Sequence, residues 1–306
     1  MDPLSDMLSG IRADRASINR ATLEPSWAIR FADGAALTML TIMKGEGRLV
    51  LHDGTERKLR AGSTALVRGP EPFRLLDLDA DAGQFGRSHQ VSCADTQAGS
   101  GLRQDPDGST TFAVGAYRAL RPRHERLLRA LPQVLVLDED IEDVLWLKGL
   151  DDALAYQGRP GGQSLTDRVL DWGLVCTLSC WFHLQGPEAP NWFRGVLDPV
   201  AGPALAAIHR DPRARWTVAS LAAEAGVSRA HFAKRFTEVM GESPLAYLTE
   251  WRMCLAEDLL EDPEKPVAEV ARSVGYADPF AFSTAFKRRR GSSPRAFRSL
   301  AASGRG

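Results

Sequence analysis

Residues 281–294 read AFSTAFKRRRGSSP, and a closely related pattern stands fifty residues earlier in the chain. The shared positions are two phenylalanines four residues apart, a glycine, a serine and a proline. They are Phe232, Phe236, Gly241, Ser243 and Pro244 in the first copy and Phe282, Phe286, Gly291, Ser293 and Pro294 in the second. Self-similarity at a constant offset indicates a repeated supersecondary unit.

Each copy predicts two short helices joined by a tight turn. In the first copy, Gly226 stands where the end of a helix favours a residue that tolerates positive φ, and Ser228 is a suitable cap for the next helix. In the second copy, Gly275 and Asp278 take these positions, and Pro279 follows at the first helical residue, which proline favours. The pattern is that of a helix-turn-helix, whose second helix enters the major groove of DNA.

The spacing between the copies supports two DNA-reading helices rather than one. Residues 244–260 predict a single long helix, about 25 Å at 1.5 Å per residue. A rod of that length could hold two reading helices near one turn of DNA, about 34 Å, apart.

The phenylalanine pairs predict which residues of the two reading helices face outward. The candidate DNA-binding residues are Arg229, Ala230, Ala233, Lys234 and Thr237 in the first helix and Phe280, Ser283, Thr284, Lys287 and Arg288 in the second. Lysine and arginine can contact bases or phosphates, whereas the alanines offer only apolar contact with a thymine methyl group. A solvated basic surface is the alternative interpretation of these positions.

Composition and charge are consistent with a two-domain globular protein with a polyanionic partner. The 306 residues are 44% apolar and 25% charged, with a net charge of −1. Residues 205–306 carry 16 Lys and Arg against 12 Asp and Glu, so the C-terminal third is mildly basic. No signal peptide or membrane-spanning run is evident, and four cysteines in this length do not form a disulfide framework. We therefore expect a cytoplasmic protein.

The first two thirds of the chain have a different pattern of apolar residues and turns. Residues 1–20 predict a short amphipathic helix, and residues 25–120 alternate short apolar runs with turns, which favours a sandwich or barrel. From residue 122 the pattern is helical. The helix expected over residues 165–184 is apolar on two faces, including Cys176, Cys180 and Trp181, so it is either fully internal or packs on a second subunit.

These residues carry a resemblance to a known family. Residues 201–300 resemble the DNA-binding domain of AraC-type bacterial transcription regulators, and IMKGEGRLVLHDGTERKLRAGSTALVRGPEPFRLL, residues 42–76, resembles the cupin barrel found upstream of it in many of them. The resemblance implies an α+β chain with three parts: a cupin-like sensor barrel over 1–121, linker or dimerisation helices over 122–198, and an all-α double helix-turn-helix domain over 199–306. At Thr284 the chain departs from the family, where arginine is frequent.

The function implied is a sequence-specific transcription regulator that responds to a signal at its N-terminal domain. The expected partners are double-stranded DNA, a second copy of the chain, a small-molecule effector and, for an activator, RNA polymerase; no membrane is expected.

Enzymatic chemistry is not expected. Cupin enzymes bind metal through clustered His and Glu, and the candidate positions here hold Arg48, His52 and Phe73. We therefore predict no metal, no cofactor and no catalytic residues. Two alternatives stay open: a thiol- or metal-responsive regulator that uses Cys93 or the Cys176/Cys180 pair, and a cupin enzyme with a nucleic-acid-binding tail.

Overall fold

The computed structural model describes residues 2–19, 27–78, 89–91, 110–118, 121, 123–141, 143–156 and 159–303. The chain divides into two compact units. The barrel unit comprises residues 10–120 and 128–181, and the helical unit comprises residues 1–9, 121–127 and 182–306.

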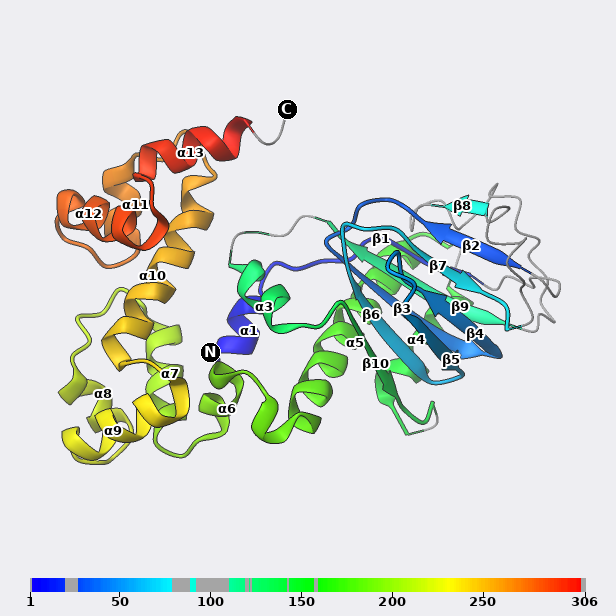
Figure 1. Cartoon of the computed structure of the whole chain (residues 1–306), viewed down its shortest axis with the longest axis horizontal. Helices are drawn as coiled ribbons and strands as arrows, with labels where there is room; N and C mark the ends of the chain where they lie inside the picture. The colour runs from blue at the N-terminus through cyan, green and yellow to red at the C-terminus, as the bar shows by residue number, and fades with distance from the viewer. Residues whose placement is uncertain are drawn as a thin grey trace. The chain divides into compact units, whose positions relative to one another are not determined.

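The described strands of the barrel unit form two five-stranded sheets. The first has the order β1 (Asp14–Asn19), β9 (Thr111–Tyr117), β3 (Leu37–Lys44), β6 (Ser63–Arg68), β10 (Val134–Asp138). The second has the order β5 (Glu56–Arg60), β4 (Glu46–Val50), β7 (Phe73–Leu76), β2 (Ala28–Phe31), β8 (His89–Val91). All pairings are antiparallel except β2 with β8. The sheets face each other (Figure 1), and one apolar cluster draws residues from both, such as Ile29 and Leu75 from the second and Leu40 and Val114 from the first.

Helix α5 (Gly162–Leu184) packs against the first sheet through one face. The Tyr117 hydroxyl on β9 donates to the carbonyl oxygen of Leu170, at 3.0 Å. A side chain at Gly173 would lie 2.6 Å from the Trp146 ring of α4 (Leu145–Ala155) and 2.8 Å from Met39, so only glycine fits there. The opposite face is exposed, with 44% of both Trp172 and Val175 accessible. Among the described residues, the doubly apolar helix is therefore covered on one side only.

Two strands were missed by the sequence prediction, and they shift the boundaries of the units. Residues 14–19, expected to be helical, form β1, and the predicted N-terminal helix is limited to α1 (Pro3–Leu8). Within the expected helical region 122–198, β10 pairs with β6 and buries Leu135 and Leu137. The region 122–198 is accordingly shared between the two units rather than forming a third part.

The helical unit contains the two copies of the repeat. Its helices are α1, α3 (His124–Ala130, of which residues 124–127 belong to this unit), α6 (Asn191–Leu197), α7 (Ala201–Arg210), α8 (Val218–Glu224), α9 (Arg229–Met240), α10 (Pro244–Leu260), α11 (Val267–Ser273), α12 (Pro279–Arg290) and α13 (Pro294–Ser303). Helix α10, 17 residues long, runs from the pair α8 and α9 to the pair α11 and α12 (Figure 1). The predicted double helix-turn-helix is confirmed.

A polar contact links the N-terminal helix to the helical unit, in addition to the apolar side chains that α1 buries. His209 of α7 is inaccessible to solvent and lies between Asp6 of α1 and Tyr247 of α10. Burial lowers the pKa of His209, although Asp6 opposes this shift. In the neutral ring, Nδ1 donates to the Asp6 carboxylate and Nε2 accepts from the Tyr247 hydroxyl at 2.8 Å. This contact ties α1 to the core of the helical unit.

A buried carboxylate, that of Asp198, joins α7 to α9. Asp198 Oδ1 accepts from the backbone N–H groups of Val200 and Ala201, both at 2.9 Å, where α7 begins. Its Oδ2 accepts from Arg235 of α9 at 2.6 and 2.9 Å. Burial opposes ionisation, but the two N–H groups and the Arg235 guanidinium outweigh it and hold the pKa of Asp198 below its usual range.

Replacing this carboxylate should destabilise the helical unit. We expect Asp198→Ala to lower the free energy of unfolding by about 1–3 kcal/mol, because α7 loses an N-terminal acceptor and Arg235 loses its partner. Asp198→Asn keeps one oxygen for the N–H groups and should lose less. Since the folded-state pKa is depressed, the stabilisation is present above about pH 4, the unfolded-state pKa, and fades as the pH falls through the folded-state value. Urea unfolding at neutral and acid pH measures this; equal stability of all three proteins at pH 7 would contradict it.

Candidate nucleic-acid interface

Each reading helix is fixed to its core by a pair of phenylalanines. Phe232 and Phe236 on α9 are fully buried, with ring centroids 5.5 Å apart. Phe282 and Phe286 on α12 are equally buried, 5.7 Å apart. Because residues four apart lie on one face of a helix, each pair directs the opposite face of its helix to solvent.

The ends of both helices are defined as the sequence predicted. Ser228 caps α9 by accepting from the N–H of His231, and Asp278 caps α12 by accepting from Phe280 and Ala281 at 3.0 and 3.1 Å. Both helices end at a glycine in the left-handed region, Gly241 with φ 74° and Gly291 with φ 76°. The first turn of each helix is therefore held in place where base contacts are made in helix-turn-helix proteins.

The predicted outward residues of α9 are accessible with one exception. Arg229, Ala230, Lys234 and Thr237 are exposed, whereas Ala233 is half-buried. Lys234 is 79% exposed, and its ammonium lies 3.9 Å from Glu238. The Thr237 hydroxyl donates to the Ala233 carbonyl oxygen at 2.8 Å, so its proton is directed to the helix itself. Arg229 and Lys234 are thus the exposed cationic groups among the predicted outward residues of α9.

The outward face of α12 combines an aromatic ring with cations. Phe280 is 84% exposed, and Thr284, Lys287 and Arg288 are exposed as well. Ser283 is half-buried, and its hydroxyl donates to the Pro279 carbonyl oxygen at 2.9 Å.

The cationic run 287–290 has two roles, which the sequence did not distinguish. Arg290 turns inward, 2.7 Å from Glu250 and 2.5 Å from Glu257 of α10, and Arg289 lies 3.9 Å from Glu250. Within the described part of the chain, no ion pair is found for Lys287 or Arg288. Arg290 therefore fastens α12 to α10, and Lys287 and Arg288 keep their charge available at the surface.

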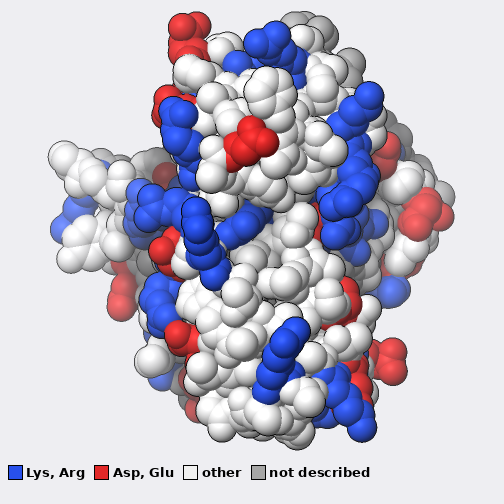
Figure 2. All heavy atoms as spheres, turned by 90° about the vertical axis from the view of Figure 1, so that its left-hand side faces the viewer, with Lys and Arg blue, Asp and Glu red and all other residues white. Residues whose placement is uncertain are grey.

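Both reading helices lie on the same side of the helical unit (Figure 1). Figure 2 looks onto that side and shows Lys and Arg side chains in its upper and middle parts and again at its lower end, with Asp and Glu side chains among them. This distribution matches the requirement of a long polyanion that passes both helices.

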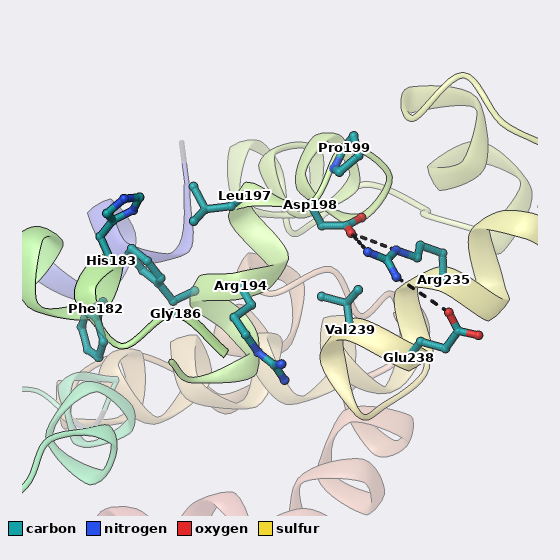
Figure 3. Close-up of a pocket in the computed structure, with 11 residues that line it drawn as sticks. Phe182, His183, Gly186, Arg194, Leu197, Asp198, Pro199, Arg235, Glu238 and Val239 are labelled. Atoms are coloured by element: carbon teal, nitrogen blue, oxygen red, sulfur yellow. Dashed lines mark hydrogen bonds and ion pairs between the residues drawn. The ribbon is translucent and has the colours of Figure 1, made fainter. Parts of the chain in front are cut away.

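A groove of about 560 Å³ lies between α9 and α6. Phe182, Phe193, Leu197 and Val239 supply apolar walls, and the Asp198–Arg235 ion pair closes one end (Figure 3). Sequence patterns did not reveal this groove, because its walls come from separate segments of the chain.

The other predicted sites do not assemble into a reactive centre. His52 is exposed, Arg48 is half-buried and Phe73 is part of the barrel core. No group of three His, Cys, Asp or Glu residues suited to a metal ion occurs among the residues that the structure describes.

Burial raises the pKa of the Cys176 and Cys180 thiols, and Glu139 raises both further, so the unreactive thiol form is favoured. Cys93 lies outside the described residues. Among those described, no helix is long and apolar enough to cross a membrane.

Comparison with known proteins agrees with this architecture. A family model described as Cupin matches residues 2–183, and one described as Helix-turn-helix domain matches residues 221–299. The DNA-binding domain of AdpA, solved in complex with a target DNA, is 36% identical over 35% of this chain and 96% of that chain, with a TM-score of 0.34. The regulator AlkR of Acinetobacter baylyi is 28% identical over 97% of this chain and 99% of its own length.

A Streptomyces lividans protein named as an AraC-like transcription regulator is 32% identical over 97% of this chain and 98% of its own length. With its N-terminal cupin domain and its C-terminal pair of helix-turn-helix motifs, the chain belongs to the AraC family of DNA-binding transcription regulators.

Proposed function

We propose that this regulator binds double-stranded DNA with α9 and α12 in successive major grooves. The observation that carries the proposal is the matched orientation of the two helices. Each turns a buried phenylalanine pair inward and presents an exposed stripe, with cations, on one side of the helical unit. In this arrangement Arg229 and Lys234 are available for base edges or phosphates, and Lys287 and Arg288 lie at the C-terminal end of α12, where phosphates follow the groove.

Regulation requires a signal that the protein senses and a way for two copies to associate. We assign both the sensing of the signal and the dimer contact to the barrel unit. We propose a homodimer through the exposed face of α5, because 44% of both Trp172 and Val175 is left uncovered within one chain. The barrel would receive a small-molecule effector, and an activator would also contact RNA polymerase. A protein of this kind acts on the chromosome in the cytoplasm and needs no catalysis, in keeping with relatives that are named as transcription regulators. Thiol sensing through Cys176 and Cys180 is less favoured, because burial stabilises their protonated form.

Lys234→Ala tests base reading by α9. We expect operator affinity to fall about 5- to 150-fold, with a broader base preference at the positions under α9, because a direct contact from lysine to guanine is lost. The operator would be selected from a random library with the full chain, and fluorescence anisotropy would measure binding. Lys58→Ala on β5, where Lys58 is 62% exposed, makes the same change of charge in the barrel unit and serves as control. Unchanged affinity and preference in Lys234→Ala would show that α9 is oriented differently on DNA.

Arg288→Ala tests phosphate contact by α12. We expect weaker binding to operator and non-operator DNA alike, because phosphates carry no base identity. The slope of log K against log salt should become shallower by about one unit, as one released counterion is lost. A salt titration from low to moderate ionic strength measures the slope. A loss restricted to the operator would instead assign Arg288 to a base.

The double variant Trp172→Glu, Val175→Glu tests the dimer. Charges on this exposed face should yield a folded monomer in sedimentation, whereas Leu145→Glu, at a residue of α4 that is 69% exposed, should leave the dimer intact. Gly173 is unsuitable for such a test, since any side chain there meets Trp146 within the barrel unit. A wild-type protein that sediments as a monomer at micromolar concentration would remove the dimer proposal.

A further inference from the structure

The first turns of α12 present almost no hydrogen-bonding group to a base. Both oxygens of Asp278 accept from the backbone at the start of the helix, and the Ser283 hydroxyl donates to the carbonyl of Pro279. The remaining exposed residues before Lys287 are Phe280, Ala281 and Thr284. None of these is an arginine, lysine, asparagine or glutamine, the residues that form paired hydrogen bonds with guanine or adenine.

In place of such a group stands an exposed aromatic ring. At 84%, Phe280 has the largest exposed fraction among the exposed large apolar side chains in the described residues. Phe282 and Phe286 of the same helix are fully buried, so the core of this motif does not use the Phe280 ring. The ring stands on the second residue of the helix, and its own backbone N–H is held by the Asp278 cap at 3.0 Å. It is therefore an exposed apolar group, on a backbone held by the cap, at the end of the helix that lies nearest to base edges in helix-turn-helix complexes.

The major groove contains one apolar feature, the C5-methyl group of thymine. We infer that Phe280 reads thymine by packing its ring against this methyl group, so that α12 selects bases by apolar contact where α9 uses cations. The inference rests on the proposed function, because it requires α12 to enter the major groove. It assigns Phe280 as a specificity-determining residue and thymine as the base it selects.

Single-atom changes in the DNA can test this assignment. In the selected operator, each thymine is replaced in turn by deoxyuridine, which removes one methyl group and keeps every hydrogen-bonding group. At one or two positions we expect wild-type affinity to fall about three- to tenfold, the effect of one lost buried methyl contact. At the same positions cytosine should bind weakly, and 5-methylcytosine should recover part of the loss because it restores the methyl group.

Substitutions of Phe280, measured with the same set of modified operators, show whether the methyl dependence comes from this ring. Phe280→Ala should bind the thymine operator less tightly and show no further loss with deoxyuridine at those positions, whereas Phe280→Leu should keep part of the methyl dependence. Leu197→Ala removes another exposed apolar side chain, 62% accessible and outside both reading helices, and should behave as wild type. Thermal unfolding should be unchanged in Phe280→Ala, because most of the ring faces solvent in the folded chain.

The outcomes separate this inference from the proposed function. If the wild type selects an operator and Phe280→Ala retains the full deoxyuridine penalty, the thymine assignment is wrong and DNA binding by this unit stands. The assignment is equally wrong if Phe280→Ala binds the operator as tightly as wild type. That result would show that the ring does not contact DNA, and a protein partner would become the better explanation of its exposure. If the wild type selects no operator, the proposed function itself fails.

Discussion

The two phenylalanine pairs set the rotation of each reading helix about its own axis, and the proposed DNA-binding surface depends on that rotation. A helix turned by one residue, about 100°, would present a different set of side chains. Phe232 and Phe236 on α9, and Phe282 and Phe286 on α12, are all completely buried. Large apolar side chains at i and i+4 are costly to expose, since burying one contributes about 1.5–3 kcal/mol. The exposed stripes are consequently defined by what is buried beneath them.

The cations of the helical unit divide between holding the reading helices and facing solvent. Arg235 on α9 is bound to Asp198, and Arg290 on α12 is bound to Glu250 and Glu257. These two arginines add ion pairs to the apolar contacts by which the phenylalanines attach each reading helix to the rest of its unit. Lys234, Lys287 and Arg288 are accessible. A simple count of positive residues would therefore overstate the positive charge that the two helices present to solvent.

The helical repeat could be predicted from the sequence, whereas the boundaries of the two units could not. The repeat could be predicted because its signals are local: helix-spaced phenylalanines, capping residues and glycines that end helices, all within about twenty residues. Strands β1 and β10 were missed because their stability comes from pairing with β9 and β6, which lie far away in the chain. The inward position of Gly173 and the inward turn of Arg290 depend on partners from other helices, so periodicity alone could not reveal them. Ser283 was correctly placed on its helix, but its hydroxyl is occupied by the backbone.

The chain crosses between the two units four times, because residues 1–9 and 121–127 belong with residues 182–306. One consequence concerns the handling of the DNA-binding half. A fragment cut at residue 199, the boundary that the repeat suggests, would lack α1 and α6 and would leave His209 without Asp6. Its α7 would expose apolar surface that is covered in the intact chain. A fragment or chimera that keeps residues 1–9 together with the C-terminal half would retain the contact between Asp6 and His209.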